Sequence, residues 1–147
     1  MNQRSPFEEA APMPNYPLST VVVIDPDPQY QRQIAYLLQE SFQCALANSL
    51  GEAFQLIQRY RPGLITLELD QPDGDAFAFI KYLQQDSALK AILIACVTGH
   101  AAIADKVRAF RAGADDYIVK PVSPTLFYGQ MLLLRRAGYI ARSVSVR

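Results

Sequence analysis

Acidic side chains follow two short apolar runs of the sequence, at the points where buried strands are expected to end. Asp25 and Asp27 come after a β-branched run, and Glu68 comes directly after another apolar run. Thr98 and Lys120 follow two later runs of the same kind. Carboxylates, a hydroxyl and an ammonium group held close together could bind a hard cation and an anionic group, or pair with one another. The chemistry therefore depends on whether the fold brings these strand ends together.

Five short apolar runs alternate with segments of helical periodicity, and this alternation predicts the fold. The expected strands cover residues 20–24, 44–47, 64–69, 91–97 and 117–119. Strands that alternate with helices form a parallel sheet covered on both faces, and right-handed crossovers restrict its winding. We expect an α/β fold of the flavodoxin-like (βα)5 type, a doubly wound parallel sheet with strand order 2-1-3-4-5. The carboxyl ends of its first and third strands then meet at one crevice, beside Asp25, Asp27 and Glu68.

Composition bounds the class of protein. Of the 147 residues, 50% are apolar and 19% are charged, which suits one domain with a sizeable core. Fourteen basic residues balance fourteen acidic ones, so no overall field favours nucleic acid or an anionic membrane as a partner. The apolar runs are too short to span a bilayer, and no glycine-rich phosphate loop follows the first strand. Cys44 and Cys96 are expected as reduced thiols inside strands of a cytoplasmic protein.

Three regions are expected along the chain. Residues 1–18 contain four prolines and little periodicity, which predicts a flexible leader. Residues 19–137 form the domain, and residues 138–147 are expected as a C-terminal tail. This tail is too short for a DNA-binding winged helix, so direct transcriptional control is not expected.

Several motifs of the domain carry a resemblance to a known family. The longest is GADDYIVKP at 113–121, and it is accompanied by Thr98-Gly99, by VVIDPDP at 22–28, and by PGLITLE at 62–68 with PDGD at 72–75. The region 19–137 resembles the receiver domain of bacterial response regulators, the CheY-like family. The resemblance implies that Lys120 contacts a phosphoryl group and that Thr98 and Tyr117 are the equivalents of its switch residues. It also implies a signalling protein as partner, either a histidine kinase or a downstream effector.

Two departures from the family pattern bear on phosphorylation. The acceptor aspartate of the family falls on Glu68, and the second acid after the first strand, which ligates Mg²⁺ in active receivers, falls on Pro26. Proline has no carboxylate, and a misplacement of about 1 Å in a reacting group can cost on the order of a hundredfold in rate. We therefore expect no bound metal, no enzymatic activity and no phosphorylation. The hypothesis is a stand-alone pseudo-receiver that acts through protein–protein interaction, with Glu68 paired to Lys120 in one fixed state.

Other interpretations of these residues are kept open. Asp70 is a rival phosphoacceptor with a rearranged Mg²⁺ site, and the whole domain could instead be a structural oligomerisation module. Asp25 could be only an N-terminal helix charge, and Asp27 could replace the lost metal ligand, although its register points elsewhere. Thr98 could cap a loop, and Tyr117 could be an ordinary strand aromatic.

The last helix is more apolar than a core stripe requires. Phe127 and Met131 belong to a stripe that suffices to cover the sheet. Leu126, Leu132 and Leu133 add further apolar groups, which favours a partner or homodimer surface built from the fourth helix, the fifth strand and the fifth helix. The alternative is a helix covered by residues 138–147.

Overall fold

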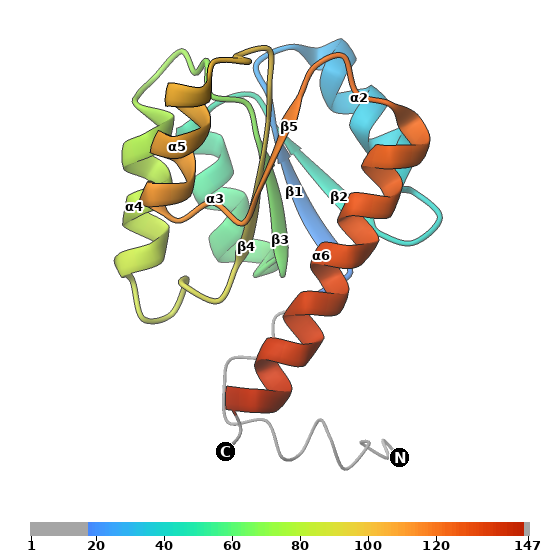
Figure 1. Ribbon diagram of the computed structural model, residues 1–147, viewed down its shortest axis with the longest axis vertical. Coiled ribbons are helices and arrows are strands. Elements are labelled where there is room, and N and C mark those ends of the chain that lie inside the picture. Colours follow the sequence, from blue (N-terminus) through green and yellow to red (C-terminus); the bar gives the residue numbers. More distant parts are fainter. Residues whose placement is uncertain (1–17, 146–147) are drawn as a thin grey trace.

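A five-stranded parallel sheet lies between two layers of helices (Figure 1). The computed structural model describes residues 18–145, with side chains described up to residue 141. The elements in chain order are β1 (Thr20–Ile24), α2 (Pro28–Leu38), β2 (Gln43–Ala47), α3 (Leu50–Tyr60), β3 (Leu64–Leu67), α4 (Ala76–Gln85), β4 (Leu93–Thr98), α5 (Ile103–Ala112), β5 (Asp116–Val119) and α6 (Pro124–Ser145).

The strand order is β2-β1-β3-β4-β5, as the sequence predicts. Every neighbouring pair of strands is parallel, and Val22 of β1 faces Ala45 of β2 on one side and Ile65 of β3 on the other. The order of strands reverses direction next to β1, so the carboxyl ends of β1 and β3 lie side by side. β3 ends at Leu67, two residues earlier than expected, and this places Glu68 directly at its end.

Two hydrophobic clusters hold the sheet, one on each face. Alternate residues of β1 enter different clusters: Val21 and Val23 pack with residues of α2 and α6, whereas Val22 and Ile24 pack with residues of α3 and α4. All four side chains are at most 1% exposed. A central parallel strand buried on both faces is expected to read as a continuous apolar run, as this one does. β1 is thus a rigid base for the acidic residues that follow it.

The connection from β1 to α2 uses Asp27 as a helix cap. Its Oδ1 accepts a hydrogen bond of 2.9 Å from the backbone N–H of Gln29, and Pro28 occupies the first helical turn. An N-cap carboxylate satisfies one of the free N–H groups at the start of a helix, and proline there loses no hydrogen bond. The exposed Asp27 side chain is therefore directed to α2.

The end of the chain differs from the expectation of a tail that begins at residue 138. The helix α6 continues to Ser145, so residues 138–145 belong to it. Gly138 is buried on the domain, and a Cβ at this position would lie 2.9 Å from Cδ1 of Leu93 and 3.0 Å from Cδ2 of Leu18. Its missing side chain lets α6 lie close to the start of the fold. Of the expected leader, residues 1–17 lie outside the described residues, and Leu18 is buried.

Candidate functional site

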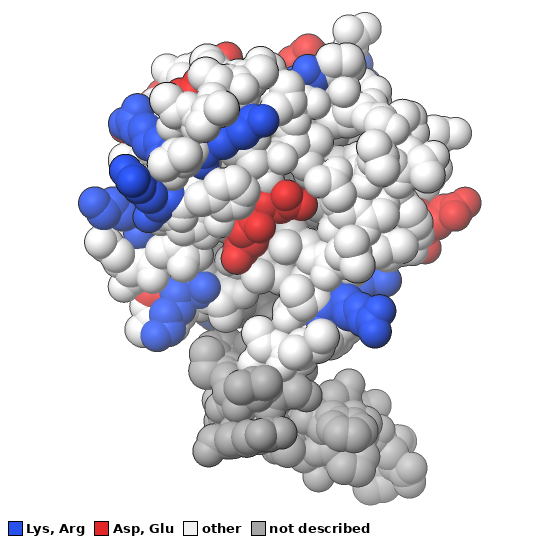
Figure 2. Space-filling model, in the orientation of Figure 1, with Lys and Arg blue, Asp and Glu red and all other residues white. Residues whose placement is uncertain are grey.

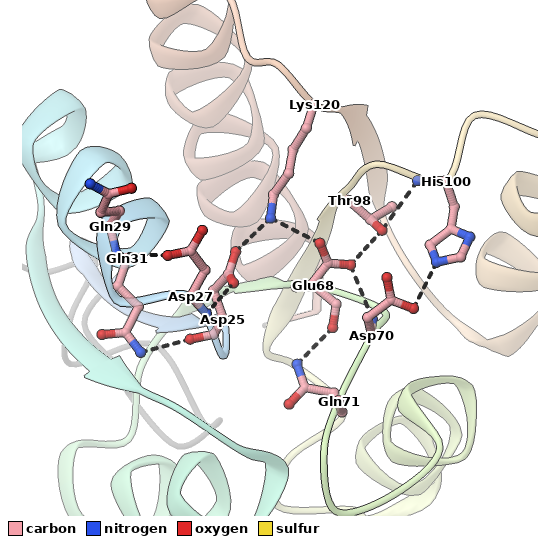
Figure 3. A network of polar contacts seen from close by, with 10 residues as sticks. All are labelled: Asp25, Asp27, Gln29, Gln31, Glu68, Asp70, Gln71, Thr98, His100 and Lys120. Carbon is pink, nitrogen blue, oxygen red and sulfur yellow. Dashed lines mark hydrogen bonds and ion pairs between the residues drawn. The ribbon is translucent and has the colours of Figure 1, made fainter.

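An ammonium group lies between two carboxylates at the carboxyl edge of the sheet (Figure 3). Nζ of Lys120, after β5, is 2.8 Å from Oδ2 of Asp25, after β1, and 2.8 Å from Oε1 of Glu68, after β3. The side chains are 15%, 3% and 9% exposed, respectively. Charge-assisted hydrogen bonds in such a poorly hydrated position are stronger than those between neutral groups. The fold thus brings together three residues that lie far apart in the sequence.

The carboxylate of Glu68 uses both of its oxygens. Oε1 faces Lys120, while Oε2 accepts a hydrogen bond of 2.5 Å from the hydroxyl of Thr98 and one of 3.0 Å from the backbone N–H of Asp70. Nε2 of Gln71 donates to the Glu68 carbonyl oxygen at 2.7 Å. The longer glutamate arm therefore carries its charge to three donors on three different segments.

The environment of Lys120 keeps it charged. Burial by itself would lower the pKa of this ammonium, but hydrogen bonds to Asp25 and Glu68, together with their charges, outweigh burial and raise the pKa above its usual value. The ring of Tyr30 lies below the ammonium, with 3.9 Å between Nζ and the ring centroid. Lys120 accordingly acts as the cation of this site at neutral pH.

A buried glutamine fixes the position of Asp25, and the sequence did not reveal it. Nε2 of Gln31 donates to the carbonyl oxygens of Asp25 at 2.7 Å and Ala47 at 3.0 Å, and it also contacts Oδ1 of Asn48. Oδ1 of Asp25 accepts from the backbone N–H of Asp27 at 2.9 Å. Gln31 lies three residues before the buried Ile34 on the inner face of α2, and this spacing was the available signal.

The segment after β4 joins Thr98, His100 and Tyr117. The hydroxyl of Tyr117 donates to the His100 carbonyl oxygen at 2.8 Å, and the backbone N–H of His100 donates to the Thr98 hydroxyl at 3.4 Å. Burial is the main cause that raises the pKa of Tyr117 to about 12. Asp70, the rival acceptor, is 77% exposed, and its Oδ1 is 2.8 Å from Nε2 of His100. Its side chain is thus paired with the loop after β4.

An open depression of about 520 Å³ lies beside this network, at the ends of β1 and β3. Pro26, Asp70, Gln71 and Arg108 are among its lining residues. A side chain at position 26 therefore faces the place where the family pattern has a metal ligand. Proline contributes no oxygen from that side chain.

The residues of the site do not fit the Mg²⁺ ion that active members of the family use. Magnesium requires oxygen ligands in near-octahedral geometry at about 2.0–2.1 Å. The oxygens of Asp25 and Glu68 that face each other already bond to the ammonium of Lys120, and Pro26 supplies no carboxylate. A cation in this position would have to displace a charged lysine.

The three leucines singled out on α6 have different environments. Leu126 is 67% exposed and Leu133 is 64% exposed, whereas Leu132 is partly buried against the hydrophobic cluster beneath α6. On α5, which packs on the opposite face of the sheet from α6, Ile103 and Phe110 are also exposed. Figure 2 shows acidic side chains in the middle of this face, uncharged atoms over the upper part of α6, and Lys and Arg side chains gathered toward α4 and α5. Among residues 18–145, no helix is long and apolar enough to cross a membrane.

The sequence is similar to known proteins. Residues 21–129 match the family model of the response regulator receiver domain. The phosphate regulon transcriptional regulatory protein PhoB of Escherichia coli (strain K12) is 30% identical over 105 residues, which are 71% of this chain and 46% of PhoB. An uncharacterized 14.6 kDa protein of Leptolyngbya boryana is 28% identical over 105 residues, which are 71% of this chain and 80% of that protein. The chain thus spans about half the length of the full PhoB protein.

Solved structures share the same fold. A CheY-like response regulator receiver domain protein from Methanospirillum hungatei JF-1 has a TM-score of 0.76 at 22% identity, over 83% of this chain and 97% of that chain. A two-component response regulator from Clostridium difficile has a TM-score of 0.75 at 24% identity, over 80% and 96% of the respective chains. With the family match over residues 21–129, the chain belongs to the response regulator receiver family.

Proposed function

We propose that this receiver domain works in two-component signalling through protein–protein contacts and without phosphorylation of its own. The observation that carries the proposal is the bonding of Glu68. Its carboxylate takes up the ammonium of Lys120 and the hydroxyl of Thr98, which the family resemblance assigns to the phosphoryl group and the switch. A ligand that shifts this domain to another state would have to compete with Glu68 for these two donors.

The geometry also disfavours chemistry at position 68. Phosphoryl transfer requires a carboxylate oxygen in line with the donor and a divalent cation to offset the charge of the phosphate. Both oxygens of Glu68 accept hydrogen bonds, and Pro26 lacks the carboxylate of a metal ligand. The two departures weaken the same reaction step, so their effects combine.

The partner under this proposal is a signalling protein, either a histidine kinase or a downstream effector, in the cytoplasm. The balance of fourteen basic and fourteen acidic residues supports a protein partner over nucleic acid. The transcriptional role in the name of PhoB belongs to a protein of which this chain spans 46%.

Intact mass tests the absence of phosphorylation. The protein is incubated with Mg²⁺ and a small phosphodonor, beside a phosphorylatable receiver as a positive control. We expect no added phosphoryl group, because no free carboxylate faces Lys120. An adduct that maps to Asp70 would support the second candidate, a phosphorylatable receiver, for which the exposure of Asp70 is the favouring observation.

The proposal also includes self-association through the face formed by α5, β5 and α6. We expect Leu133→Glu to shift the protein from dimer to monomer in sizing at high concentration, because this side chain is 64% exposed and costs little to change in the monomer. The matched variant Leu132→Glu should instead lower the free energy of unfolding by about 1–3 kcal/mol, since Leu132 packs on the core. A wild-type protein that stays monomeric at all concentrations rules out the homodimer and leaves the face to another partner.

A further inference from the structure

One imidazole lies between two carboxylates at the edge of the site. Nε2 of His100 is 2.8 Å from Oδ1 of Asp70, in the loop after β3, and Nδ1 is 3.7 Å from Oδ2 of Asp105, in α5. Figure 3 shows the ring turned toward Asp70. His100 is the one histidine of the chain, and its side chain is 42% exposed. The ring therefore spans two segments that otherwise belong to different parts of the fold.

The protonation state of this ring determines to how many carboxylates it can donate a hydrogen bond. A neutral imidazole has one N–H group and can donate to one acceptor, whereas the protonated ring donates from both nitrogens and carries a positive charge. Asp70 and Asp105 offer only acceptors when they are ionised. The neutral ring can therefore donate to only one of the two carboxylates, whereas the protonated ring links Asp70 to Asp105.

Hydrogen bonds of backbone groups connect this bridge to the buried network around Glu68. The backbone N–H of Asp70 donates to Oε2 of Glu68 at 3.0 Å, and the backbone N–H of His100 approaches the Thr98 hydroxyl at 3.4 Å. The carbonyl oxygen of His100 accepts from the hydroxyl of Tyr117 at 2.8 Å. A movement of either end of the bridge therefore reaches residues that contact the Glu68 carboxylate or hold the aromatic side chain of β5.

We propose that His100 is a pH-sensitive latch, which in its protonated form ties the loop after β3 to α5 beside the network around Glu68 and holds Tyr117 through its own carbonyl group. In the neutral form one of the two ties is lost, and the loop that carries His100 and accepts from Tyr117 gains freedom. This inference goes beyond the proposed function, because it assigns a proton as an input and requires no statement about phosphorylation.

The charges that face His100 favour protonation. They are Asp70 after β3, Asp105 of α5 and Glu68 at the end of β3, and Lys120 after β5 is itself bound to Glu68. The hydrogen bond to Asp70 is the largest cause and raises the pKa of His100; burial opposes it, and the charges of the three acids raise the pKa further. Since the pKa is raised in the folded state, the latch stabilises the fold fully below the unfolded pKa of about 6.5. This contribution is lost as the pH rises through the folded pKa.

The single histidine makes the test direct, because its imidazole proton resonances in an NMR titration are unambiguous. We expect His100 in the wild-type protein to titrate above the ordinary value, and Asp70→Asn to move this titration down toward about 6.5. Asp105→Asn should cause a smaller downward shift, because its contact is longer. The matched control Glu40→Gln, at an exposed site in the turn after α2, should leave the titration unchanged.

A second readout separates a latch from a local ion pair. The ring resonances of Tyr117 and the amide resonances of Thr98 and Asp70 should follow the midpoint of His100, and this pH dependence should vanish in His100→Gln. The proposal is overturned if His100 titrates at its ordinary value and ignores Asp70→Asn. It is equally overturned if Tyr117 shows no change across the His100 midpoint. The titration uses no phosphodonor, so its outcome is independent of the intact-mass experiment.

Discussion

Replacement of Lys120 by methionine is expected to lower the free energy of unfolding by about 3–5 kcal/mol, because it leaves two buried carboxylates without their cation. Asp25 and Glu68 are 3% and 9% exposed, so water cannot replace the ammonium. Methionine keeps most of the length of the lysine side chain but removes the ammonium that lies 3.9 Å from the ring centroid of Tyr30. Urea unfolding at neutral pH measures the loss, and an unchanged denaturant slope indicates that only stability has changed.

Two further variants make this expectation specific. Lys90→Met removes an exposed lysine and should change stability by no more than about 0.5 kcal/mol. Adding Glu68→Gln to Lys120→Met should recover part of the loss, because one of the two unpaired charges is then absent. If Lys120→Met lowers the free energy of unfolding by less than about 1 kcal/mol, the ion pairs of Lys120 with Asp25 and Glu68 behave as solvated surface pairs.

The double variant Pro26→Asp with Glu68→Asp is expected to accept a phosphoryl group, whereas the proposed function predicts none on the wild-type protein. Aspartate withdraws the carboxylate by about one C–C bond of 1.5 Å, away from Lys120 and Thr98, and frees an oxygen to attack. Position 26 lines the depression beside the site, so an aspartate there supplies the missing metal ligand. Intact mass in the presence of Mg²⁺ and a small phosphodonor should show one added phosphoryl group.

The single variants separate the contribution of the nucleophile at position 68 to phosphorylation from that of the metal ligand at position 26. Pro26→Asp alone should give no adduct, and Glu68→Asp alone should react on the order of a hundredfold more slowly than the double variant. Asp70→Asn in the double-variant background should leave the adduct in place, which locates it at position 68. Failure of the folded double variant to react would show that the barrier to phosphorylation lies outside these two positions.

The strands and their order could be predicted because their signals are local and redundant. β1 is a run of β-branched residues bounded by Asp25 and Pro26, and the order of strands follows from right-handed crossovers. Gly113 closes α5 with a φ of 126°, a conformation that glycine adopts without strain. The convergence of Asp25, Glu68 and Lys120 follows from that topology, since parallel strands end at the same edge.

Other features depend on contacts that the sequence does not display. Gly138 resembles the end of a helix in sequence, yet it allows close packing within α6, and the two uses of glycine look alike without coordinates. Leu132 and Leu133 are both apolar neighbours, and only the rotation of α6 against the sheet distinguishes a partly buried side chain from an exposed one. Gln31 is polar, so its place on the apolar face of α2 did not register as a buried donor.

The position of Lys120 has a consequence for how the site responds to its surroundings. A metal ion occupies a site according to its free concentration, so dilution or a chelator can remove it. The ammonium of Lys120 is part of the chain and lies 2.8 Å from each carboxylate. Its effective concentration at the site therefore does not fall when the protein is diluted. Under the proposed function, occupancy of a complex then follows the cellular amounts of this protein and its partner. Changes in copy number then control the complex in addition to any input through the protonation of His100.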